Sequence, residues 1–286
     1  MKSQTLVMIF LLLTLSCKQG EKKSLDWTYL FAGDNLEQWD TYLGPRFGPD
    51  VSWENIGSQP AMGHNNDTLG VFSIVDLNGA SVLRISGQVW GGIFTKREFE
   101  NYHLQLQFKW GEKKWYPRGG PSDKRDSGLL YHGIGTHGEN DLFWLKSQEF
   151  QIQEGDCGDF WGVAGTIIDV RAQMAKDSAY YYNPQAELLT FKEHGQHGRN
   201  CKKQPDAEKP SGEWNTIDLY CFEGTSVHLV NGTVTMILHN SRHVREDGEE
   251  IPLRKGKIEL QSESAEVFYK DIKIRPIKFL PNRFKE

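Results

Sequence analysis

The sequence predicts an all-β protein, a β-sandwich or jelly roll of antiparallel strands. Segments in which apolar and polar residues alternate recur along the chain, and this alternation is typical of half-buried strands. Gly, Asn, Asp and Pro residues separate the segments and predict turns. Few convincing helices lie between them, and many short strands without intervening helices favour two packed sheets.

The alternating segments follow one another from the first quarter of the sequence to its end. They are residues 70–76, 81–86, 102–110, 127–133, 148–153, 215–222, 226–230, 233–238, 256–261 and 267–274. Asn231 and Gly232 predict a type I′ hairpin between two of them, because both residues tolerate the positive φ angles of that turn. No internal repeat and no Pro- or Ser-rich linker divides the chain, so we expect residues 25–286 to form one domain.

The composition narrows the class of protein and of partner. Of the 286 residues, 25% are charged and 38% hydrophobic, which is typical of a soluble globular protein. A net charge of −5 provides no basic surface, which argues against nucleic acid as a partner. Aromatic residues make up 12% and include nine Trp. Such residues line sugar-binding clefts, but they also pack in the cores of β-proteins, so both interpretations stay open.

The N-terminus predicts export. Lys2 precedes an apolar run over residues 6–15, which is shorter than the roughly 20 residues needed to span a bilayer. Residues 14–17 (TLSC) resemble a bacterial lipobox, in which Cys17 is lipidated. We therefore expect a signal peptide over residues 1–17, a polar tether over 18–24 and a lipid anchor in the cell envelope. The alternative is an ordinary secretory signal cut near Cys17.

Three further cysteines, Cys157, Cys201 and Cys221, leave room for one disulfide in an oxidising compartment. A Cys157–Cys201 bond would join two loop-like segments. No Cys-x-x-Cys spacing predicts a zinc site.

Long loops are predicted over residues 112–126, 134–145, 155–174 and 192–212. Loops of this length are uncommon in compact domains unless they are functional or disordered. Three of them flank residues 147–162 (SQEFQIQEGDCGDFWG) in the sequence. We therefore expect them to wall a cleft beside this segment.

One face of that segment is polar throughout. Glu149, Gln151 and Gln153 alternate with Phe150 and Ile152, so in a strand the three polar side chains lie on the same side. Such a face either meets solvent, as is common in antiparallel sheets, or forms one wall of a binding cleft.

Six segments resemble, in the same order, the motifs of the 3-keto-disaccharide hydrolase family. They are residues 30–39 (LFAGDNLEQW), 91–110 (GGIFTKREFENYHLQLQFKW), 125–132 (RDSGLLYH), 149–156 (EFQIQEGD), 212–232 (GEWNTIDLYCFEGTSVHLVNG) and 256–274, which contains GKIELQSE and YKDIKI. His132 stands where many relatives have Arg, and Lys270 with Asp271 where many have Arg-Asn.

The resemblance implies a concanavalin A-like jelly roll of two antiparallel sheets, with a concave face that holds the sugar. It implies lyase or hydrolase action on a glucoside or disaccharide already oxidised to a ketone at C3. For some members it also implies a divalent metal ion, whose identity the sequence leaves open.

The chemistry of such a substrate sets the requirements for a site. A ketone at C3 acidifies the proton on C2; a base removes it, the enolate expels the C1 substituent, and water then adds to the keto-glucal. The site needs a general base, an electrophile for the enolate oxygen and a proton donor for the leaving group. A metal ion is one possible electrophile.

The polar face supplies the main candidates. We expect Glu149 to act as base or metal ligand and Gln151 as an orienting amide. The alternation of the neighbouring strand places His132 on the same face as Leu130, where it would be a base or a metal ligand with Glu149. A β-bulge near Gln153 would bring Glu154 to this face as an acid or ligand.

Three further residues are predicted to bind substrate: Lys96, Asp156 and Gln261. A second hypothesis is a retaining β-glucanase of the same fold, in which Glu149 and Glu154 are the two carboxyls, about 5.5 Å apart. A third is a carbohydrate-binding module without catalysis.

Overall fold

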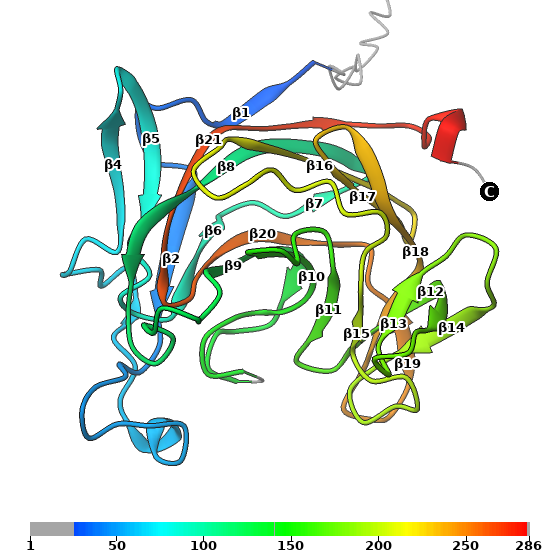
Figure 1. Ribbon diagram of the computed structural model, residues 1–286, viewed down its shortest axis with the longest axis horizontal. Coiled ribbons are helices and arrows are strands. Elements are labelled where there is room, and N and C mark those ends of the chain that lie inside the picture. Colours follow the sequence, from blue (N-terminus) through cyan, green and yellow to red (C-terminus); the bar gives the residue numbers. More distant parts are fainter. Residues whose placement is uncertain (1–25, 140, 285–286) are drawn as a thin grey trace, which may run out of the picture.

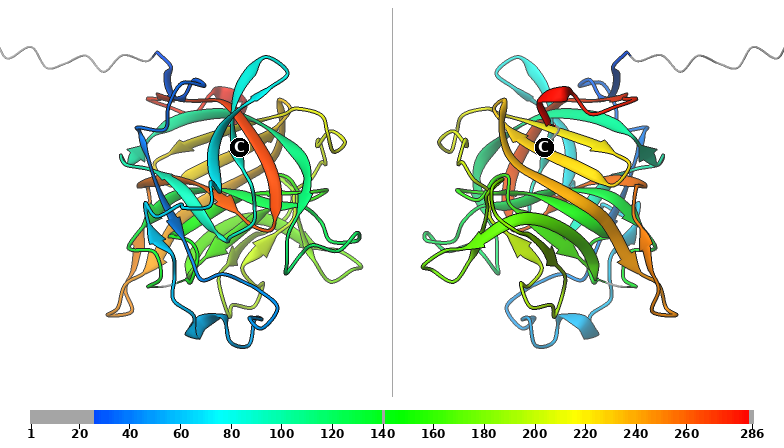
Figure 2. Two further views of the ribbon diagram at one scale, coloured as in Figure 1. Left: turned by 90° about the vertical axis from the view of Figure 1, so that its left-hand side faces the viewer. Right: turned by 90° about the vertical axis from the view of Figure 1, so that its right-hand side faces the viewer.

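The computed structural model describes residues 26–139 and 141–284, and it confirms the all-β prediction. Two antiparallel sheets pack face to face (Figures 1 and 2). The helical elements of the described residues are two short 3₁₀ turns, η1 (Ile56–Ser58) and η2 (Asn282–Phe284). No helix in these residues is long and apolar enough to cross a membrane.

The twelve-stranded sheet lies uppermost in Figure 1. Its strands run in the order β13 (Tyr180–Tyr182), β12 (Thr166–Met174), β18 (Thr233–Val244), β17 (Thr225–Val230), β16 (Asn215–Phe222), β8 (Tyr102–Lys114), β21 (Ala265–Pro276), β5 (Ala80–Ile85) and β4 (Phe72–Leu77). Outside this order, three strands each pair with one neighbour: β1 (Thr28–Phe31) with β21, β14 (Leu188–Phe191) with β12, and β19 (Glu250–Pro252) with β18.

The nine-stranded sheet lies below it. Its order is β15 (Asn200–Cys201), β11 (Phe160–Val163), β10 (Lys146–Gln153), β9 (Asp126–Ile134), β20 (Lys255–Ser262), β6 (Gly91–Thr95), β2 (Trp39–Leu43) and β3 (Gly63–His64), with β7 (Phe99–Glu100) paired to β20. The predicted loop over residues 155–174 is therefore wrong from residue 160 onward, because β11 and β12 lie there.

The main core lies between the two sheets and is built from alternate residues of each strand. Phe150 and Ile152 of β10 are fully buried in the same apolar cluster as Leu104 and Leu106 of β8. Because side chains alternate across a strand, the other residues of β10 point to the opposite face of the nine-stranded sheet. We call this face, which includes Glu149, the open face.

The cysteines show that the expected disulfide is wrong. Cys157, Cys201 and Cys221 are buried free thiols. Cys157 packs in the main core, whereas Cys201 packs in a second cluster around Phe160 and Phe191. Burial raises the pKa of Cys157 well above its ordinary value, so this thiol stays protonated. The signal peptide, the tether and Cys17 lie outside the described residues.

Candidate active site

The register of three adjacent strands gathers polar side chains on the open face. Glu149, Gln151 and Gln153 of β10 lie opposite Leu130, Gly128 and Asp126 of β9, respectively. On the other side of β9, β20 pairs Glu259 with Leu130 and Leu260 with Leu129, which brings Gln261 beside Gly128. The polar face predicted for residues 147–153 is thus present, and it continues across β9 onto β20.

These side chains surround a cavity of about 150 Å³. The strands and their ends supply the acids and amides, namely Asp126, Glu149, Gln151, Gln153, Gln261 and Glu263. Three of the predicted long loops add Arg118, Asp141 with Trp144, and Arg199, and β11 adds Trp161. As expected from their length, these loops wall a cleft beside β10. Figure 1 shows the loop between β9 and β10 below the nine-stranded sheet.

Glu149 lines the cavity and is only 6% exposed. Its carboxyl accepts no hydrogen bond from another described residue. A Cβ at Gly128 would lie 2.4 Å from Glu149 Oε1 and 2.2 Å from Gln261 Oε1, so only glycine lets the two side chains meet above β9. Burial, reinforced by the nearby Asp126 carboxyl, raises the pKa of Glu149 well above its ordinary value.

Two amide oxygens in the cavity are buried without a hydrogen-bond partner. They are Oε1 of Gln151 and Oε1 of Gln261. The amide of Gln151 is oriented by its nitrogen, which donates to Asp126 Oδ1 at 3.2 Å. Because native proteins rarely leave buried acceptors unpaired, these oxygens are suited to accept hydrogen bonds from the hydroxyls of a ligand.

A guanidinium and two carboxyls form the second part of the cavity. Arg118 contacts Asp126, and its Nη1 lies 2.9 Å from Glu263 Oε1. Gln153 also donates to Asp126 at 2.5 Å. Burial raises the pKa of Asp126 to about 6 despite the contact with Arg118. Burial and the neighbouring Asp126 raise the pKa of Glu263 well above its ordinary value. Two close carboxyls in such a place share a proton at neutral pH.

The remaining wall combines aromatic rings with one acid, Asp141, and one guanidinium group, that of Arg199. Asp141 accepts hydrogen bonds from the backbone nitrogens of Phe143 (2.8 Å) and Trp144 (3.2 Å), which fixes the loop that holds them. Burial raises the pKa of Asp141. Across the cavity, the guanidinium of Arg199 lies 5.2 Å from the ring centre of Trp161. The cavity therefore offers acids, amides, two guanidinium groups and aromatic surface, a combination suited to a polyhydroxylated ligand.

The sequence matches the model of the 3-keto-alpha-glucoside-1,2-lyase-like domain over residues 26–275. The chain belongs to this family. Membership gives the protein a carbohydrate-active role. A comparison with curated proteins finds no match.

Three solved structures are similar to the chain, each with a TM-score below 0.5. A candidate glycosyl hydrolase of Parabacteroides distasonis has 16% identity and a TM-score of 0.49, with 88% of this chain and 94% of that one covered. A second from the same organism has 21% identity, a TM-score of 0.46 and coverage of 88% and 100%. A Bacillus licheniformis β-glucanase has 8% identity, a TM-score of 0.42 and coverage of 88% and 98%.

His132 does not reach the open face. The pairing of β9 shifts register next to it on both sides, and His132 has a left-handed φ of 56°. This bulge turns the imidazole into the core, where it packs against Tyr102 and Tyr131. Burial lowers the pKa of His132 to about 3. The expected placement beside Glu149 is wrong because the strand does not alternate regularly through this residue.

Glu154 also lies outside the cavity. The pairing of β10 with β9 stays in register from Gln148 to Gln153, so no bulge forms at Gln153. Glu154 instead forms an ion pair with Arg125 at 3.1 Å and accepts a hydrogen bond from Ser211. Although partial burial opposes them, these contacts lower the pKa of Glu154. The pair of carboxyls required by the β-glucanase hypothesis, Glu149 with Glu154, is therefore not assembled.

Of the three predicted substrate-binding residues, the structure places one in the cavity. Gln261 lines it. Lys96 is half exposed, with its Nζ 3.9 Å from Asp40 Oδ1 at the end of β6. Asp156 pairs with Lys124 at 2.5 Å in the turn after β10, among exposed side chains.

The cavity does not fit a divalent metal ion. The described residues contain no group of three His, Cys, Asp or Glu side chains arranged to hold one. The predicted ligands Glu149 and His132 lie on opposite faces of the sheet. Asp126 and Glu263 already share the guanidinium of Arg118, which occupies the place a cation would take between them.

Sequence reasoning missed several residues of the cavity. Asp126 and Glu263 each lie two residues from a position on the open face, Gly128 and Gln261, so the period of two was a usable signal for both. Arg118, Asp141 and Arg199 come from loops, where no periodicity applies. For these three residues, the length of the loops was the only signal.

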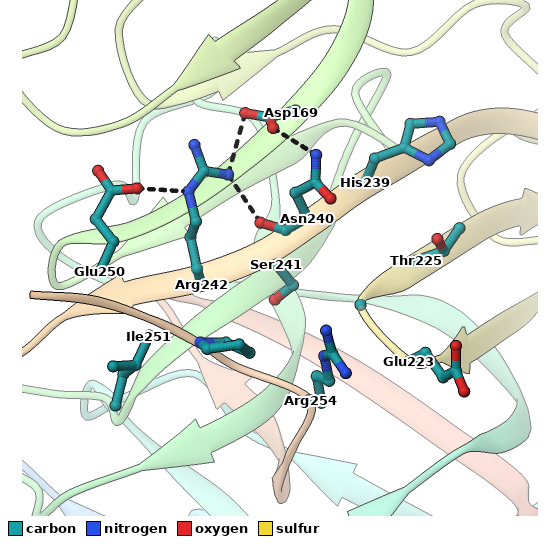
Figure 3. Close-up of a pocket in the computed structure, with 12 residues that line it drawn as sticks. Asp169, Glu223, Thr225, His239, Asn240, Ser241, Arg242, Glu250, Ile251 and Arg254 are labelled. Carbon is teal, nitrogen blue, oxygen red and sulfur yellow. Dashed lines mark hydrogen bonds and ion pairs between the residues drawn. The ribbon is translucent and has the colours of Figure 1, made fainter.

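A larger hollow of about 510 Å³ lies on the twelve-stranded sheet, among β12, β17, β18 and β19 (Figure 3). We call it the outer hollow. Arg242 lies in it and donates to Asp169 at 3.1 Å and to Glu250 at 2.7 Å. Asn240 also donates to Asp169, at 2.8 Å. These groups compensate one another, and Glu223, which also lines the outer hollow, is exposed, so the outer hollow lacks the buried, unpaired acid of the cavity.

Proposed function

We propose that the protein cleaves 3-keto-glycosides in the cavity of the open face, by removing the C2 proton and eliminating the C1 substituent. The observation that supports this most strongly is Glu149, a buried carboxyl without a hydrogen-bond partner among the described residues, beside two unpaired amide oxygens. Membership in the 3-keto-alpha-glucoside-1,2-lyase-like family favours a substrate of this class.

Glu149 is the base in this proposal. Its raised pKa makes the ionised form a stronger base than an ordinary carboxylate, which suits removal of a weakly acidic C–H proton. Entry of the sugar excludes water from the cavity, and the proton then passes directly from C2 to a Glu149 oxygen. The rate should rise with pH as Glu149 becomes ionised.

Arg118 is the electrophile that stabilises the enolate oxygen at C3. It contacts two acids of the cavity, Asp126 and Glu263, and these contacts fix its position before substrate binds. A fixed cation in a dry site stabilises developing negative charge without reorganising. This role requires no metal ion in the step.

Glu263 is the proton donor for the leaving oxygen. Asp126 accepts hydrogen bonds from Gln151, Gln153 and Arg118, all of which favour its ionised form. Among the described residues, Arg118 is the one ion-pair partner of Glu263, so the proton shared by the two carboxyls resides mainly on Glu263. An acid and a base with differently tuned environments are what the elimination requires.

Gln151 and Gln261 orient the sugar. Their free oxygens accept hydrogen bonds from ring hydroxyls, and loss of either acceptor should weaken binding more than the chemical step. The location in the cell envelope, through lipidation of Cys17, is part of the same proposal and rests on residues 14–17 of the sequence.

The decisive test compares a 3-keto-glucoside with its unoxidised parent, with and without a chelator. We expect the absorbance of the keto-glucal to appear only with the oxidised substrate and to be insensitive to the chelator. Release of sugar from the unoxidised glucoside or from β-glucan would support the glycosidase hypothesis instead. Binding of either sugar without turnover would support a binding module.

A further inference from the structure

Aromatic rings form a continuous cluster at one rim of the cavity. Phe47 and Trp53 come from the loop between β2 and β3, Trp90 from the segment before β6, and Tyr116 from the loop after β8. Ring centres lie 4.7 Å apart for Phe47 and Trp53, 5.0 Å for Trp53 and Trp90, and 6.2 Å for Phe47 and Tyr116. We call these four residues the aromatic rim.

Packing alone explains part of the aromatic rim but not all of it. Trp90 is buried and its indole nitrogen donates to Ser264 at 2.7 Å, which is the usual state of a structural Trp. Trp53 is 55% exposed and Tyr116 is 54% exposed. A large exposed aromatic surface beside a pocket is typical of a binding site, where a ligand or partner covers that surface.

Trp53 is held in place although most of it is exposed. Phe47 and Trp90 contact it at interplanar angles of 65° and 73°, so neither ring stacks flat on the indole. The two contacts hold the indole in place, and its 55% exposure leaves apolar surface for another ring. Fixing an aromatic group in advance lowers the entropy lost when it binds a ligand.

The aromatic rim is continuous with the cavity. The guanidinium of Arg118 lies 5.2 Å from the ring centre of Trp90, and Arg118 also contacts Glu263. Trp144 lines the cavity and stacks on Trp90, with ring centres 5.5 Å apart. A ligand that fills the cavity therefore extends over the aromatic rim if it has a second ring.

We infer that the aromatic rim, through Trp53, binds the cyclic group attached to C1 of the substrate and so selects glycosides with a ring-shaped leaving group. This inference rests on the proposed function. The chemistry recognised is a flat apolar ring face, which either a second pyranose or an aromatic aglycone presents. Contacts with this remote group add binding energy that a methyl glycoside does not provide.

The test measures kcat/KM for 3-keto-glucosides with a methyl, a phenyl and a glucosyl group at C1. We expect Trp53→Ala to lower kcat/KM roughly five- to tenfold for the two ring-bearing substrates and to leave the methyl glycoside unchanged. Trp53→Phe should retain most of the activity. A loss with phenyl but not glucosyl would identify an aromatic aglycone, and the reverse would identify a sugar.

Phe279→Ala is the matched control, because Phe279 is 67% exposed and does not line the cavity. It should change none of the three values. An equal loss for all three substrates in Trp53→Ala, or no loss at all, would overturn the inference. The midpoint of thermal unfolding distinguishes a local effect from a folding defect.

A binding measurement separates this inference from the proposed function. Two proteins are compared, Glu149→Gln and the double variant that adds Trp53→Ala. The measurement is the equilibrium binding of phenyl glucoside, glucosyl glucoside and methyl glucoside, which involves no turnover. If the double variant binds phenyl glucoside or glucosyl glucoside more weakly than Glu149→Gln does, and binds methyl glucoside equally well, the inference is supported. This holds even if no 3-keto-glucoside is cleaved. Equal affinities of the two proteins for both ring-bearing sugars would refute it, whatever the catalytic activity.

Discussion

The cavity of the open face and the outer hollow differ in how their charges are compensated. In the outer hollow, Arg242 is paired with Asp169 and Glu250, and Asn240 completes the arrangement (Figure 3). In the cavity, Glu149 has no partner among the described residues, and two amide oxygens are buried unpaired. The outer hollow is the larger, at about 510 Å³ against 150 Å³.

The difference shows that volume alone does not locate a site. Leaving a buried carboxyl and two acceptors without partners costs stability, and a folded protein retains such a cost where a ligand or a reaction uses it. A hollow whose buried charged groups satisfy one another, and whose remaining acid, Glu223, meets solvent, is explained by folding alone. The same kind of substitution should therefore have very different effects on activity in the two regions.

The largest effect is expected from substitution of Glu149. Glu149→Gln should lower kcat on a 3-keto-glucoside by about 10²- to 10⁴-fold, because it removes the base. Glu154→Gln is the control from the same segment, since Glu154 pairs with Arg125 outside the cavity. Initial rates at saturating substrate check both; comparable activity in the two variants would contradict the assignment.

The two arginines provide a direct comparison of the two regions. Arg118→Ala should lower kcat by about 10²- to 10³-fold, because the enolate loses its cation and two carboxyls lose their partner. Arg242→Ala removes a similarly paired arginine from the outer hollow and should leave kcat unchanged. If Arg242→Ala caused the greater loss, the reaction would have to be placed in the outer hollow.

A single methyl group tests the geometry above β9. Gly128→Ala should displace Glu149 and Gln261, since the new Cβ would lie within 2.4 Å of both side-chain oxygens. Misplacement of catalytic groups by about 1 Å costs on the order of 10² in rate, so kcat should fall by about that factor. Gly48→Ala, where nothing lies within 4 Å of the added Cβ and the backbone is not left-handed, controls for the loss of a glycine.

The smallest effect is on stability and depends on pH. The folded-state pKa of Glu149 lies above its unfolded value, so its ionisation destabilises the fold progressively as pH rises from the unfolded pKa through the folded one. Glu149→Gln lacks this ionisation and should be more stable by about 0.5–2 kcal/mol at pH 8. Thermal or urea unfolding at pH 5 and pH 8 should show the gain shrinking at the lower pH. A gain that grew on acidification would contradict the assigned burial.

The alternation of residues was sufficient to predict the sheets and one wall of the cavity. Glu149 and Gln151 follow directly from the period of two, and so do Asp126 and Glu263 once the neighbouring strands are included. His132 was misplaced because a bulge interrupts that period, and the residue in the bulge has no sequence signal of its own. Glu154 was misplaced for the opposite reason, because the expected bulge is absent.

The loop residues of the cavity depend on tertiary structure. Arg118, Asp141 and Arg199 are far apart in the sequence, and only the folding of three loops over the nine-stranded sheet brings them together. Residues in loops have no fixed spacing that links side chain to face, so long loops predict a cleft without predicting which side chains enter it.

The most direct test of the account is exchange of the C2 proton in deuterated water. A 3-keto-glucoside is incubated with the protein, and proton NMR follows the C2 signal in substrate and product. We predict enzyme-dependent loss of the C2 proton with the unmodified protein and with Glu154→Gln, and loss at the uncatalysed rate with Glu149→Gln. Cleavage with full retention of the C2 proton, or undiminished exchange in Glu149→Gln, would contradict the proposal that Glu149 initiates the reaction at C2.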